Sequence, residues 1–585
     1  MAKIDGYHIM VISCYFKTIK DFKNVQLVCK KYKDTLLKFH FNPIPLTTKT
    51  RRYFQNLETF HIYPGTSDYF ENDNFYRVIS WCPIELGTVP HNFNTRKKYF
   101  VSKDSNVAFP LPRLNIIEIK KHSFESSYIV QSTKLINFDK IPDTVTSIGE
   151  YTFFRFNYEG KMTLPPNLQS LGNNAFSLCK MSEVVVNELL TDIGESVFEN
   201  CTQLTTVVLP LSINNVPRSF LLNCINLKTI KFVNSVYTED RMCAFSDLAF
   251  HTCKSLSCID TPLSITSFGN CCFGRCTSLT CINFPSKLMH LGKFCFEQCC
   301  SIKEIEIPLS VTHIGKCCFV CCQNLTAVVL KCELNEISEH LFGDCISLQS
   351  VEYPQSVTSI QDYAFLNCKK ITSINLKNIK VIGKSAFRKC SSLTDINLEN
   401  VIKLGEKCFS NCEKLVKVSA TGKIKILPNN CFENCGYLEE FEFPQELEII
   451  GKSCFSKCVK LKGKIEFNKI TEIGEECFLE CHDIHNVIIN GCLEELKYET
   501  FMNCVSLEQV ILSKTVERIK DGCFMNCLSL KEVKCEGNTV IDGMNCFVGC
   551  EVLDKINIRF RGIEYGSFKG CKQLERNATI DKLYF

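Results

Sequence analysis

Apolar and polar positions repeat along most of the chain in a unit of about 23 residues, from about Ile116 to Leu574. The unit can be written C-x-x-L-x-x-I-x-[IFL]-P-x-x-V-x-x-I-G-x-x-[AC]-F-x-x-C. Its L-x-x-I-x-I part alternates with period two and often ends at a proline, which predicts a short strand. V-x-x-I-G predicts a second short extended piece closed by a glycine turn, and [AC]-F-x-x-C predicts one helical turn.

The cysteine that closes each unit measures the spacing of the repeats. It stands at 18 positions from Cys179 to Cys571, and twelve of the 17 intervals between them are 23 residues long. The interval between Cys224 and Cys253 is 29 residues, and its extra length predicts a loop at about Ser235–Met242, because a loop disturbs a stack less than a change of register. Three charged residues of this loop are expected in solvent: Glu239, Asp240 and Arg241.

A single unit cannot close a core, so the units must stack and bury their apolar side chains against their neighbours. With two degenerate copies before the first closing cysteine, we expect a β-rich solenoid of about 20 repeats, with phenylalanine and cysteine ladders along its axis. The expected organisation is an N-terminal region over residues 1–105, the solenoid over residues 106–575 and a tail over residues 576–585.

Two successive copies read TSLTCINFPSKLMHLGKFCFEQC (Thr277–Cys299) and CSIKEIEIPLSVTHIGKCCFVCC (Cys300–Cys322). These units resemble the leucine-rich repeats of the BspA type, also called the Treponema type, and the resemblance covers most of the chain. It implies a β-rich leucine-rich-repeat solenoid that binds other macromolecules and performs no catalysis. We therefore expect a protein-interaction scaffold without a cofactor or a metal ion.

Residues 5–40 do not follow the repeat, and their mixed helical spacing predicts two or three short helices. DFKNVQLVCKKY (Asp21–Tyr32) resembles the second half of an F-box. That resemblance implies docking to a Skp-type adaptor of a cullin-type ubiquitin ligase. The implied docking residues are Ile12, Phe16, Asp21, Phe22 and Val28. The other interpretation is a small helical cap that covers the first repeat.

Composition bounds the class of protein and its partners. Hydrophobic residues make up 45% of the chain and charged residues 22%, as in an ordered soluble protein. The net charge of +4 argues against a nucleic-acid partner. The first residues, MAKIDGYHIMVISCYF, do not look like a signal peptide, and no apolar run is long enough to insert into a membrane. We expect a cytoplasmic protein, with a cell-surface adhesin or antigen as the alternative.

The 40 cysteines are mostly accounted for by the repeat frame. Eighteen are the closing residues, and nine more precede the repeat phenylalanine, where Ala175, Ala364 and Ala386 stand in other copies. Exchange of alanine and cysteine indicates a small buried apolar position, so we expect reduced, buried thiols. Two denser groups suggest metal or redox chemistry as alternatives: Cys477, Cys481, His482 and His485, and Cys317, Cys318, Cys321 and Cys322.

The polar positions of L-x-x-I-x-I are expected to face away from the core and to form a long surface of the kind that repeat proteins use for partners. This surface is acidic toward its C-terminal half, which favours a basic protein ligand. The acidic residues expected to contact a partner are Asp260, Glu304, Glu306, Glu352, Asp395, Glu439, Glu440, Glu442 and Glu466. The other interpretation is a solvated strand face with no ligand.

Overall fold

The computed structural model describes residues 6–63, 68, 70, 73, 75–80, 98–101, 116–119, 141–233, 242–535, 537–557, 559–560 and 566–577. The chain forms two compact units. Unit 1 contains Met1–Cys276 and Cys281–Pro285, and unit 2 contains Thr277–Thr280 and Ser286–Phe585. Together they comprise about 17 turns of a parallel β-solenoid with little helix, so the expected fold class is confirmed.

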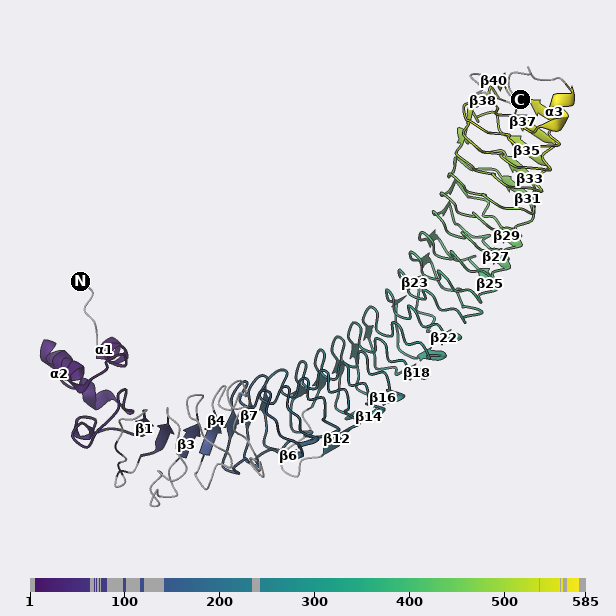
Figure 1. The fold of residues 1–585 in the computed structure, drawn as a ribbon. Helices are drawn as coiled ribbons and strands as arrows, with labels where there is room; N and C mark the ends of the chain where they lie inside the picture. The colour runs from purple at the N-terminus through teal and green to yellow at the C-terminus, as the bar shows by residue number, and fades with distance from the viewer. Residues whose placement is uncertain are drawn as a thin grey trace. The chain divides into compact units, whose positions relative to one another are not determined.

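Short helices precede the first strands of unit 1 (Figure 1). The helices and 3-10 turns are α1 (Gly6–Ser13), α2 (Ile19–Val28), η1 (Lys30–Tyr32), η2 (Thr35–Lys38) and η3 (Arg51–Tyr53). Phe22 of α2 is their central core residue, because its ring contacts Phe39 and Phe54 edge-on, with centroids 5.7 and 5.6 Å apart. The N-terminal segment is therefore a small helical layer with its own aromatic core.

Parallel strand pairing begins well before residue 106, where the solenoid was expected to start. The strands β1 (Thr59–Ile62), β2 (Arg77–Ser80), β3 (Lys98–Val101) and β4 (Ile116–Ile119) pair in sequence order. The reason is visible in Leu57-Glu58-Thr59-Phe60-His61-Ile62, which already has the alternating apolar pattern of a repeat strand.

In unit 1, each further turn contributes a short strand from V-x-x-I-G and a longer one from L-x-x-I-x-I. The short strands are β5 (Ser147–Ile148), β7 (Ser170–Leu171), β9 (Asp192–Ile193), β11 (Asn215–Val216), β13 (Ala244–Phe245) and β15 (Ser267–Phe268). The long strands are β6 (Lys161–Thr163), β8 (Glu183–Val185), β10 (Thr206–Pro210), β12 (Thr229–Val233), β14 (Cys258–Asp260) and β16 (Cys281–Asn283). Both strand types predicted from the repeat are therefore confirmed.

Unit 2 continues the same two-strand pattern, and Figure 1 shows its long strands stacked turn upon turn. Its short strands are β17 (His290–Leu291), β19 (His313–Ile314), β21 (Glu336–Ile337), β23 (Ser359–Ile360), β24 (Val381–Ile382), β26 (Lys403–Leu404), β28 (Ile426–Leu427), β30 (Ile449–Ile450), β32 (Glu472–Ile473), β34 (Glu495–Leu496), β36 (Arg518–Ile519), β38 (Val540–Ile541) and β40 (Arg559–Phe560). Its long strands are β18 (Glu304–Ile307), β20 (Ala327–Leu330), β22 (Ser350–Glu352), β25 (Asp395–Asn397), β27 (Lys417–Ser419), β29 (Glu440–Glu442), β31 (Gly463–Phe467), β33 (Ile484–Ile489), β35 (Gln509–Leu512), β37 (Glu532–Cys535) and β39 (Lys555–Asn557). Helix α3 (Lys572–Asn577) follows the last described turn.

The repeat phenylalanines form the core ladder that the sequence predicts. In unit 2 the rings of Phe296 and Phe319 stack with centroids 5.4 Å apart and planes 5° apart, and Phe319 stacks in turn on Phe342 at 5.9 Å. All three side chains are fully buried. Each ring therefore packs against its equivalents in neighbouring turns, as a repeat core requires.

The [AC]-F-x-x-C segment is not the single helical turn expected from its sequence. The residue directly before this apolar pair and the residue directly before the closing cysteine adopt left-handed backbone conformations, as at Cys317 (φ 57°) and Cys321 (φ 60°). The backbone N–H of Phe319 and that of Cys321 donate to carbonyls of the next turn at 3.1 and 2.8 Å. The expected helix is replaced by two linked turns, because stacking offers these N–H groups partners outside the segment.

The predicted loop at 235–242 lies outside the described residues except for Met242, which is buried. None of the helices in the described part of the chain has the length and apolar content to cross a membrane.

Candidate interaction surfaces and thiol sites

The long strands present their polar residues to solvent, as the period-two pattern predicts. In β18, Glu304 and Glu306 are exposed while Ile305 and Ile307 are buried. The same alternation exposes the acidic residues of β14, β22, β25, β29 and β31. We call the outward side chains of the long strands the long-strand face. All nine acidic residues expected on it lie in or directly beside these strands.

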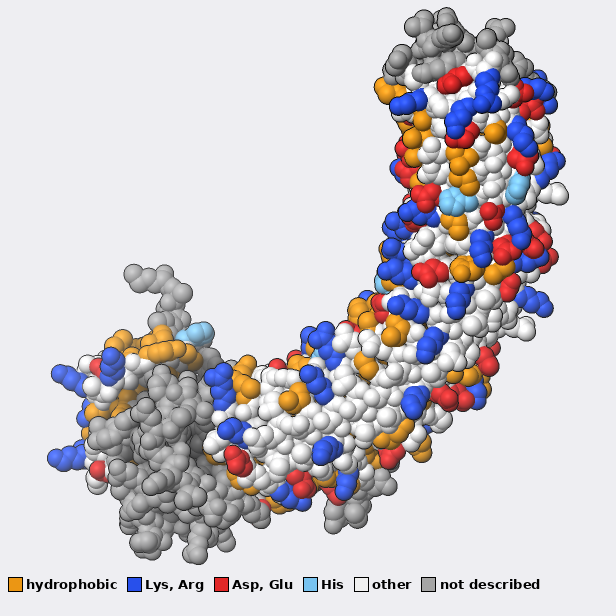
Figure 2. Space-filling view, turned by 45° about the vertical axis from the view of Figure 1, so that its right-hand side comes forward, with side chains coloured by type: hydrophobic (Ala, Val, Ile, Leu, Met, Phe, Trp, Pro, Cys, Tyr) orange, Lys and Arg blue, Asp and Glu red, His pale blue; other side chains and the backbone are white. Residues whose placement is uncertain are grey.

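Most of these carboxylates are neutralised by lysines of the same or an adjacent turn. Lys417 of β27 lies opposite Glu440 of β29 in register and binds its carboxylate at 2.9 Å and that of Glu442 at 3.9 Å. Lys462 lies 2.5 Å from Glu439 and holds the pKa of that carboxyl below its ordinary value. Figure 2 shows acidic and basic side chains interspersed over the repeats. Exposed pairs of this kind add little stability.

The remaining acidic residues of the face differ in the partners of their carboxylates. Glu306 pairs with Lys331 at 2.6 Å, Glu466 pairs with Lys464 at 2.8 Å, and Asp260 accepts a hydrogen bond from Asn283 at 3.0 Å. Four carboxylates have no ion-pair partner among the described residues: Asp260 in unit 1, and Glu304, Glu352 and Asp395 in unit 2. The unneutralised carboxylates of this set in unit 2 are therefore the last three, all in the first half of that unit.

A polar groove of about 600 Å³ lies over the short strands of unit 1. Pro217 lines it and stands where many other turns have a glycine. Gly194 and Gly269 donate their N–H groups to the preceding turn at 2.7 and 2.8 Å, but proline has no N–H to donate. β9 and β11 fall in separate sheets, as β26 and β28 do beside Pro428. The charged side chains lining the groove are Asp192, Glu195, Arg218 and Asp247.

This Pro217 groove combines one guanidinium with three carboxylates, so it is poorly suited to an anionic polymer. Two of the carboxylates are already held within the fold. Asp192 accepts a hydrogen bond from the Ser170 hydroxyl at 3.1 Å, and Asp247 accepts one from the backbone N–H of Asn270 at 2.6 Å. No pattern in the repeat predicts the groove.

The five residues implied as docking residues in the N-terminal segment have different environments. Ile12 is 42% exposed and Val28 is 73% exposed, whereas Phe16 is half-buried and Phe22 is buried in the aromatic core. The carboxylate of Asp21 accepts hydrogen bonds from the backbone N–H and the hydroxyl of Thr18, both at 2.9 Å. These bonds begin α2 and hold the pKa of Asp21 below its ordinary value.

The exposed members of that set are accompanied by other exposed apolar side chains in α1, just after α1 and in α2. Val11 is 42% exposed, Tyr15 is 83% exposed and Leu27 is 84% exposed. We call Val11, Ile12, Tyr15, Leu27 and Val28 the N-terminal patch. The same segment of the chain also carries exposed lysines at positions 17, 20, 23, 30 and 31. The patch therefore joins apolar and positively charged chemistry, which exposed side chains scattered singly do not provide.

The closing cysteines are buried structural thiols. In successive turns the thiol of each donates to the carbonyl of the repeat phenylalanine in the preceding turn, as from Cys345 to Phe319 at 3.2 Å. Burial raises the pKa of Cys201, Cys390 and Cys504 to about 12. A thiol held in the protonated form is a hydrogen-bond donor and a poor nucleophile.

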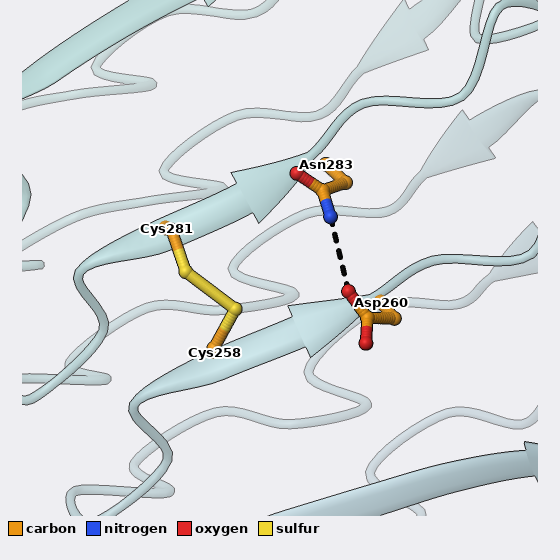
Figure 3. Close-up of a disulfide and its surroundings, with 4 residues drawn as sticks. All are labelled: Cys258, Asp260, Cys281 and Asn283. Carbon is orange, nitrogen blue, oxygen red and sulfur yellow. Dashed lines mark hydrogen bonds between the residues drawn. A yellow bond between two sulfur atoms is a disulfide. The ribbon is translucent and has the colours of Figure 1, made fainter.

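One pair of cysteines departs from the expectation of reduced, buried thiols. Cys258 of β14 and Cys281 of β16 are exposed on the long-strand face and form a disulfide between equivalent positions of adjacent turns (Figure 3). In Figure 3 the hydrogen bond from Asn283 to Asp260 joins the same two strands, two residues further along. The repeat frame could have indicated this pair, since 23 residues separate the two cysteines.

The two denser cysteine groups are divided between core and surface. Cys477 and Cys481 are buried, and the thiol of Cys481 donates to the carbonyl of Phe455 at 3.1 Å. Cys317 and Cys321 are half-buried, and burial raises the pKa of both. No three His, Cys, Asp or Glu side chains in the described part of the chain are placed to hold a metal ion.

Comparison with known proteins places these surfaces on a recognised architecture. A family model described as BspA type Leucine rich repeat region matches, in six copies, residues 126–248, 243–372, 358–485 and 463–575. The comparison with curated proteins finds no match.

The chain is also similar to solved structures of leucine-rich repeat proteins, to different degrees. A leucine-rich repeat protein from Bacteroides ovatus is 20% identical, covers 69% of this chain and 92% of its own, and has a TM-score of 0.50. A leucine rich cell surface protein from Faecalibacterium prausnitzii is 20% identical over 65% of this chain and 89% of its own, with a TM-score of 0.33. A Leucine Rich Repeat protein of T. pallidum is 26% identical over 27% of this chain and 77% of its own, with a TM-score of 0.26.

Proposed function

Because the chain belongs to the family of BspA-type leucine-rich repeat proteins, we propose that it is a non-catalytic scaffold that binds a basic protein ligand on its long-strand face. The observation that carries this proposal is the set of three carboxylates without ion-pair partners, Glu304, Glu352 and Asp395, displayed from parallel strands of one unit. A rigid strand face loses little conformational freedom on binding, and unpaired charge steers an oppositely charged partner.

Charge reversal of these three residues tests the scaffold proposal. The variant carries Glu304→Lys, Glu352→Lys and Asp395→Lys, and proteins captured from the cell's own lysate are quantified against the unaltered chain. Basic proteins should be lost from the variant. A matched control exchanges a paired couple, Glu439→Lys with Lys462→Glu, which preserves the ion pair and the net charge. Identical captured proteins for all three chains would reject the long-strand face as the binding surface.

A second candidate function is that of an F-box-like substrate receptor, and the N-terminal patch favours it. Leu27 and Val28 are more than two-thirds exposed within the segment whose sequence resembles an F-box, and exposed apolar side chains of this size suit a protein partner. Docking of a Skp-type adaptor here would leave the solenoid to hold a substrate, with ubiquitin transfer performed by partner enzymes.

The structure decides which variant can test adaptor docking. Phe22→Asp would place a charge in the aromatic core and unfold the segment, so loss of binding would carry no information. Val28→Asp changes an exposed side chain, and Lys33→Asp is a matched exposed control in the same segment. Co-purification with a Skp-type adaptor should be lost only in Val28→Asp. Absence of the adaptor from the unaltered chain rules this function out.

The cytoplasm and the cell surface are the two candidate locations of the scaffold, and the redox state of its cysteines distinguishes between them. The Cys258–Cys281 disulfide suits an oxidising compartment or the cell surface, whereas the many free thiols suit the cytoplasm. Alkylation of intact cells before lysis, followed by peptide mass analysis, reads the state of this pair. A reduced pair supports the cytoplasmic proposal, and an oxidised pair supports the cell-surface alternative.

A further inference from the structure

Three successive turns of unit 2 present lysine and aliphatic side chains in alternation on the short strands. Each of these strands has two outward positions, the residue before the strand and its first residue, while its second residue is buried. We call the six residues at these positions the lysine–aliphatic patch: Lys380, Val381, Ile402, Lys403, Lys425 and Ile426. Lysine and aliphatic residues exchange positions from each turn to the next, which produces a checkerboard.

The same two positions are both polar in several other turns of unit 2, whereas Met289, Ile449 and Val540 are apolar residues at one of them. In the polar turns these positions hold Thr312–His313, Thr358–Ser359, Thr471–Glu472 and Glu494–Glu495. Polar residues at these positions are what a solvated strand face requires, and the patch is distinguished by an exposed aliphatic residue in each of three consecutive turns. Val381 is 37% exposed, Ile402 is 56% exposed and Ile426 is 51% exposed. Exposed apolar side chains in three consecutive turns form a patch rather than an isolated residue.

The backbone fixes the arrangement of the first two turns. Val381 of β24 lies opposite Lys403 of β26 in register, and the N–H of Ile402 donates to the carbonyl of Lys380 at 2.8 Å. Each lysine stem therefore runs beside an aliphatic neighbour, which covers part but not all of the apolar surface. A partner would meet a preformed surface, because the strands are already held by the stack.

The charge of the patch is positive. Lys380 and Lys403 have no ion-pair partner among the described residues, whereas Lys425 binds Glu448 at 2.7 Å. A further pair, Lys384 with Glu406 at 3.9 Å, lies beyond the strand ends on the side of the turn segment. The patch therefore offers two unneutralised ammonium groups between exposed aliphatic side chains.

We propose that the lysine–aliphatic patch is a second interaction surface, which binds a polypeptide segment that alternates acidic and aliphatic side chains. Carboxylates of such a segment would meet Lys380 and Lys403, while its aliphatic groups would remove Val381, Ile402 and Ile426 from water. This charge preference is opposite to that of the long-strand face. The inference does not depend on the proposed scaffold function, because it concerns different strands and a different partner chemistry.

The test uses the full chain and three short fluorescent peptides: one alternating glutamate and leucine, one alternating glutamate and serine, and one alternating lysine and leucine. Fluorescence anisotropy should show binding of the glutamate–leucine peptide only. The double variants Lys380→Glu with Lys403→Glu, and Ile402→Ser with Ile426→Ser, should each weaken that binding by about tenfold or more, since like charges repel and the apolar contact is lost. Lys414→Glu is the matched control, because Lys414 is exposed in the same turns outside the patch.

All substituted side chains are exposed, so circular dichroism should show the fold of each variant unchanged. Failure of the glutamate–leucine peptide to bind, or equal binding to all variants, would overturn the proposal. Equal binding of the glutamate–serine peptide would reduce the patch to a general anion site and also overturn it. Vesicles of phosphatidylcholine and phosphatidylserine form a further arm, and binding to them without binding to the peptide would replace the polypeptide by a lipid surface.

Discussion

The thiol of Cys322 donates a hydrogen bond to the backbone carbonyl of Phe296, 3.2 Å away in the preceding turn. The same bond joins the closing cysteine and the phenylalanine through most of the ladder, with the sulfur 3.0 to 3.3 Å from the oxygen in each case. Cys253 makes the equivalent bond to the carbonyl of Leu221 at 3.3 Å. The carbonyl of Phe296 also accepts the backbone N–H of Cys299 in its own turn at 3.2 Å, so the thiol supplies a second hydrogen bond from a side chain small enough to fit between the stacked turns. This relationship explains why the repeat closes with cysteine.

Removal of that donor should destabilise the turn locally. Cys322→Ala removes one of the two donors to the carbonyl of Phe296, which keeps the backbone N–H of Cys299 at 3.2 Å, so the change should cost about 0.5–1.5 kcal/mol. Cys322→Ser retains a hydroxyl donor and should cost less than Cys322→Ala. The C–O bond of serine is shorter than the C–S bond of cysteine, so the hydroxyl reaches the carbonyl less well than the thiol does. Hydrogen exchange of the amides in the flanking turns measures the local free energy of opening. Equal effects of alanine and serine would show that the hydrogen bond contributes nothing.

The same ladder predicts loss of stability in alkaline solution. Burial raises the pKa of Cys201, Cys390 and Cys504 to about 12 in the folded state, whereas a thiol in the unfolded chain has a pKa of about 8.5. Between these values the unfolded chain binds fewer protons than the folded chain, so the free energy of unfolding falls as the pH rises. The stabilisation is complete below about pH 8.5 and is lost progressively up to about pH 12.

Urea unfolding with reductant present, at neutral pH and at about pH 10, measures this effect. A variant with Cys390→Ser and Cys504→Ser should show a smaller drop between the two pH values, because two titrating groups are removed. A chain whose free energy of unfolding is the same at both pH values would contradict the assignment of the closing cysteines as buried thiols.

The phenylalanine ladder should be the main source of local stability. Phe319→Ala removes a fully buried ring that stacks on Phe296 and Phe342, and it should cost about 3–5 kcal/mol in the surrounding turns. Phe294→Ala is the matched control, because this ring is 38% exposed in an adjacent turn. Hydrogen exchange should show the large loss of protection only for Phe319→Ala. Comparable losses for both variants would show that a stacked, buried ring contributes no more to local stability than an exposed ring does.

The parts of the fold that the sequence predicts are those determined by burial. Ile305 and Ile307 must turn inward, so Glu304 and Glu306 must turn outward, and the alternation suffices to locate both faces. The ladder of Phe319 follows in the same way, because a large apolar side chain repeated at fixed spacing can only stack. Exposure of the candidate face is therefore predictable, residue by residue.

The parts that the sequence does not predict depend on relations between turns. Whether Glu440 is free or paired is determined by Lys417, which is 23 residues earlier and opposite in register. The disulfide likewise depends on two cysteines at equivalent positions of adjacent turns. Aligning the repeats and comparing neighbouring turns position by position would have indicated both.

Asparagine directly before the closing cysteine should stabilise the left-handed turn. Asn434 has φ 59°, and its side-chain amide donates to the side-chain oxygen of Asn411 at 2.9 Å. Asn434→Ala places an unfavoured residue in this conformation and removes the bond, so it should cost about 1–2 kcal/mol or more. Asn434→Gly removes the same bond but tolerates the conformation, so it should cost less in urea unfolding. A glycine variant less stable than the alanine variant would contradict the conformational explanation.

The disulfide between Cys258 and Cys281 should make the stability of adjoining turns depend on reductant. The bond closes a segment of 23 residues, and it should stabilise this part of unit 1 by about 3 kcal/mol through its effect on the unfolded chain. Reduction should therefore increase hydrogen exchange in β14 and β16. The double variant Cys258→Ser with Cys281→Ser should show that faster exchange with and without reductant, because it cannot form the bond. The buried thiols serve as an internal control, since a reductant cannot change cysteines that are already reduced. Reductant sensitivity that persists in the double variant would place the responsible disulfide elsewhere in the chain.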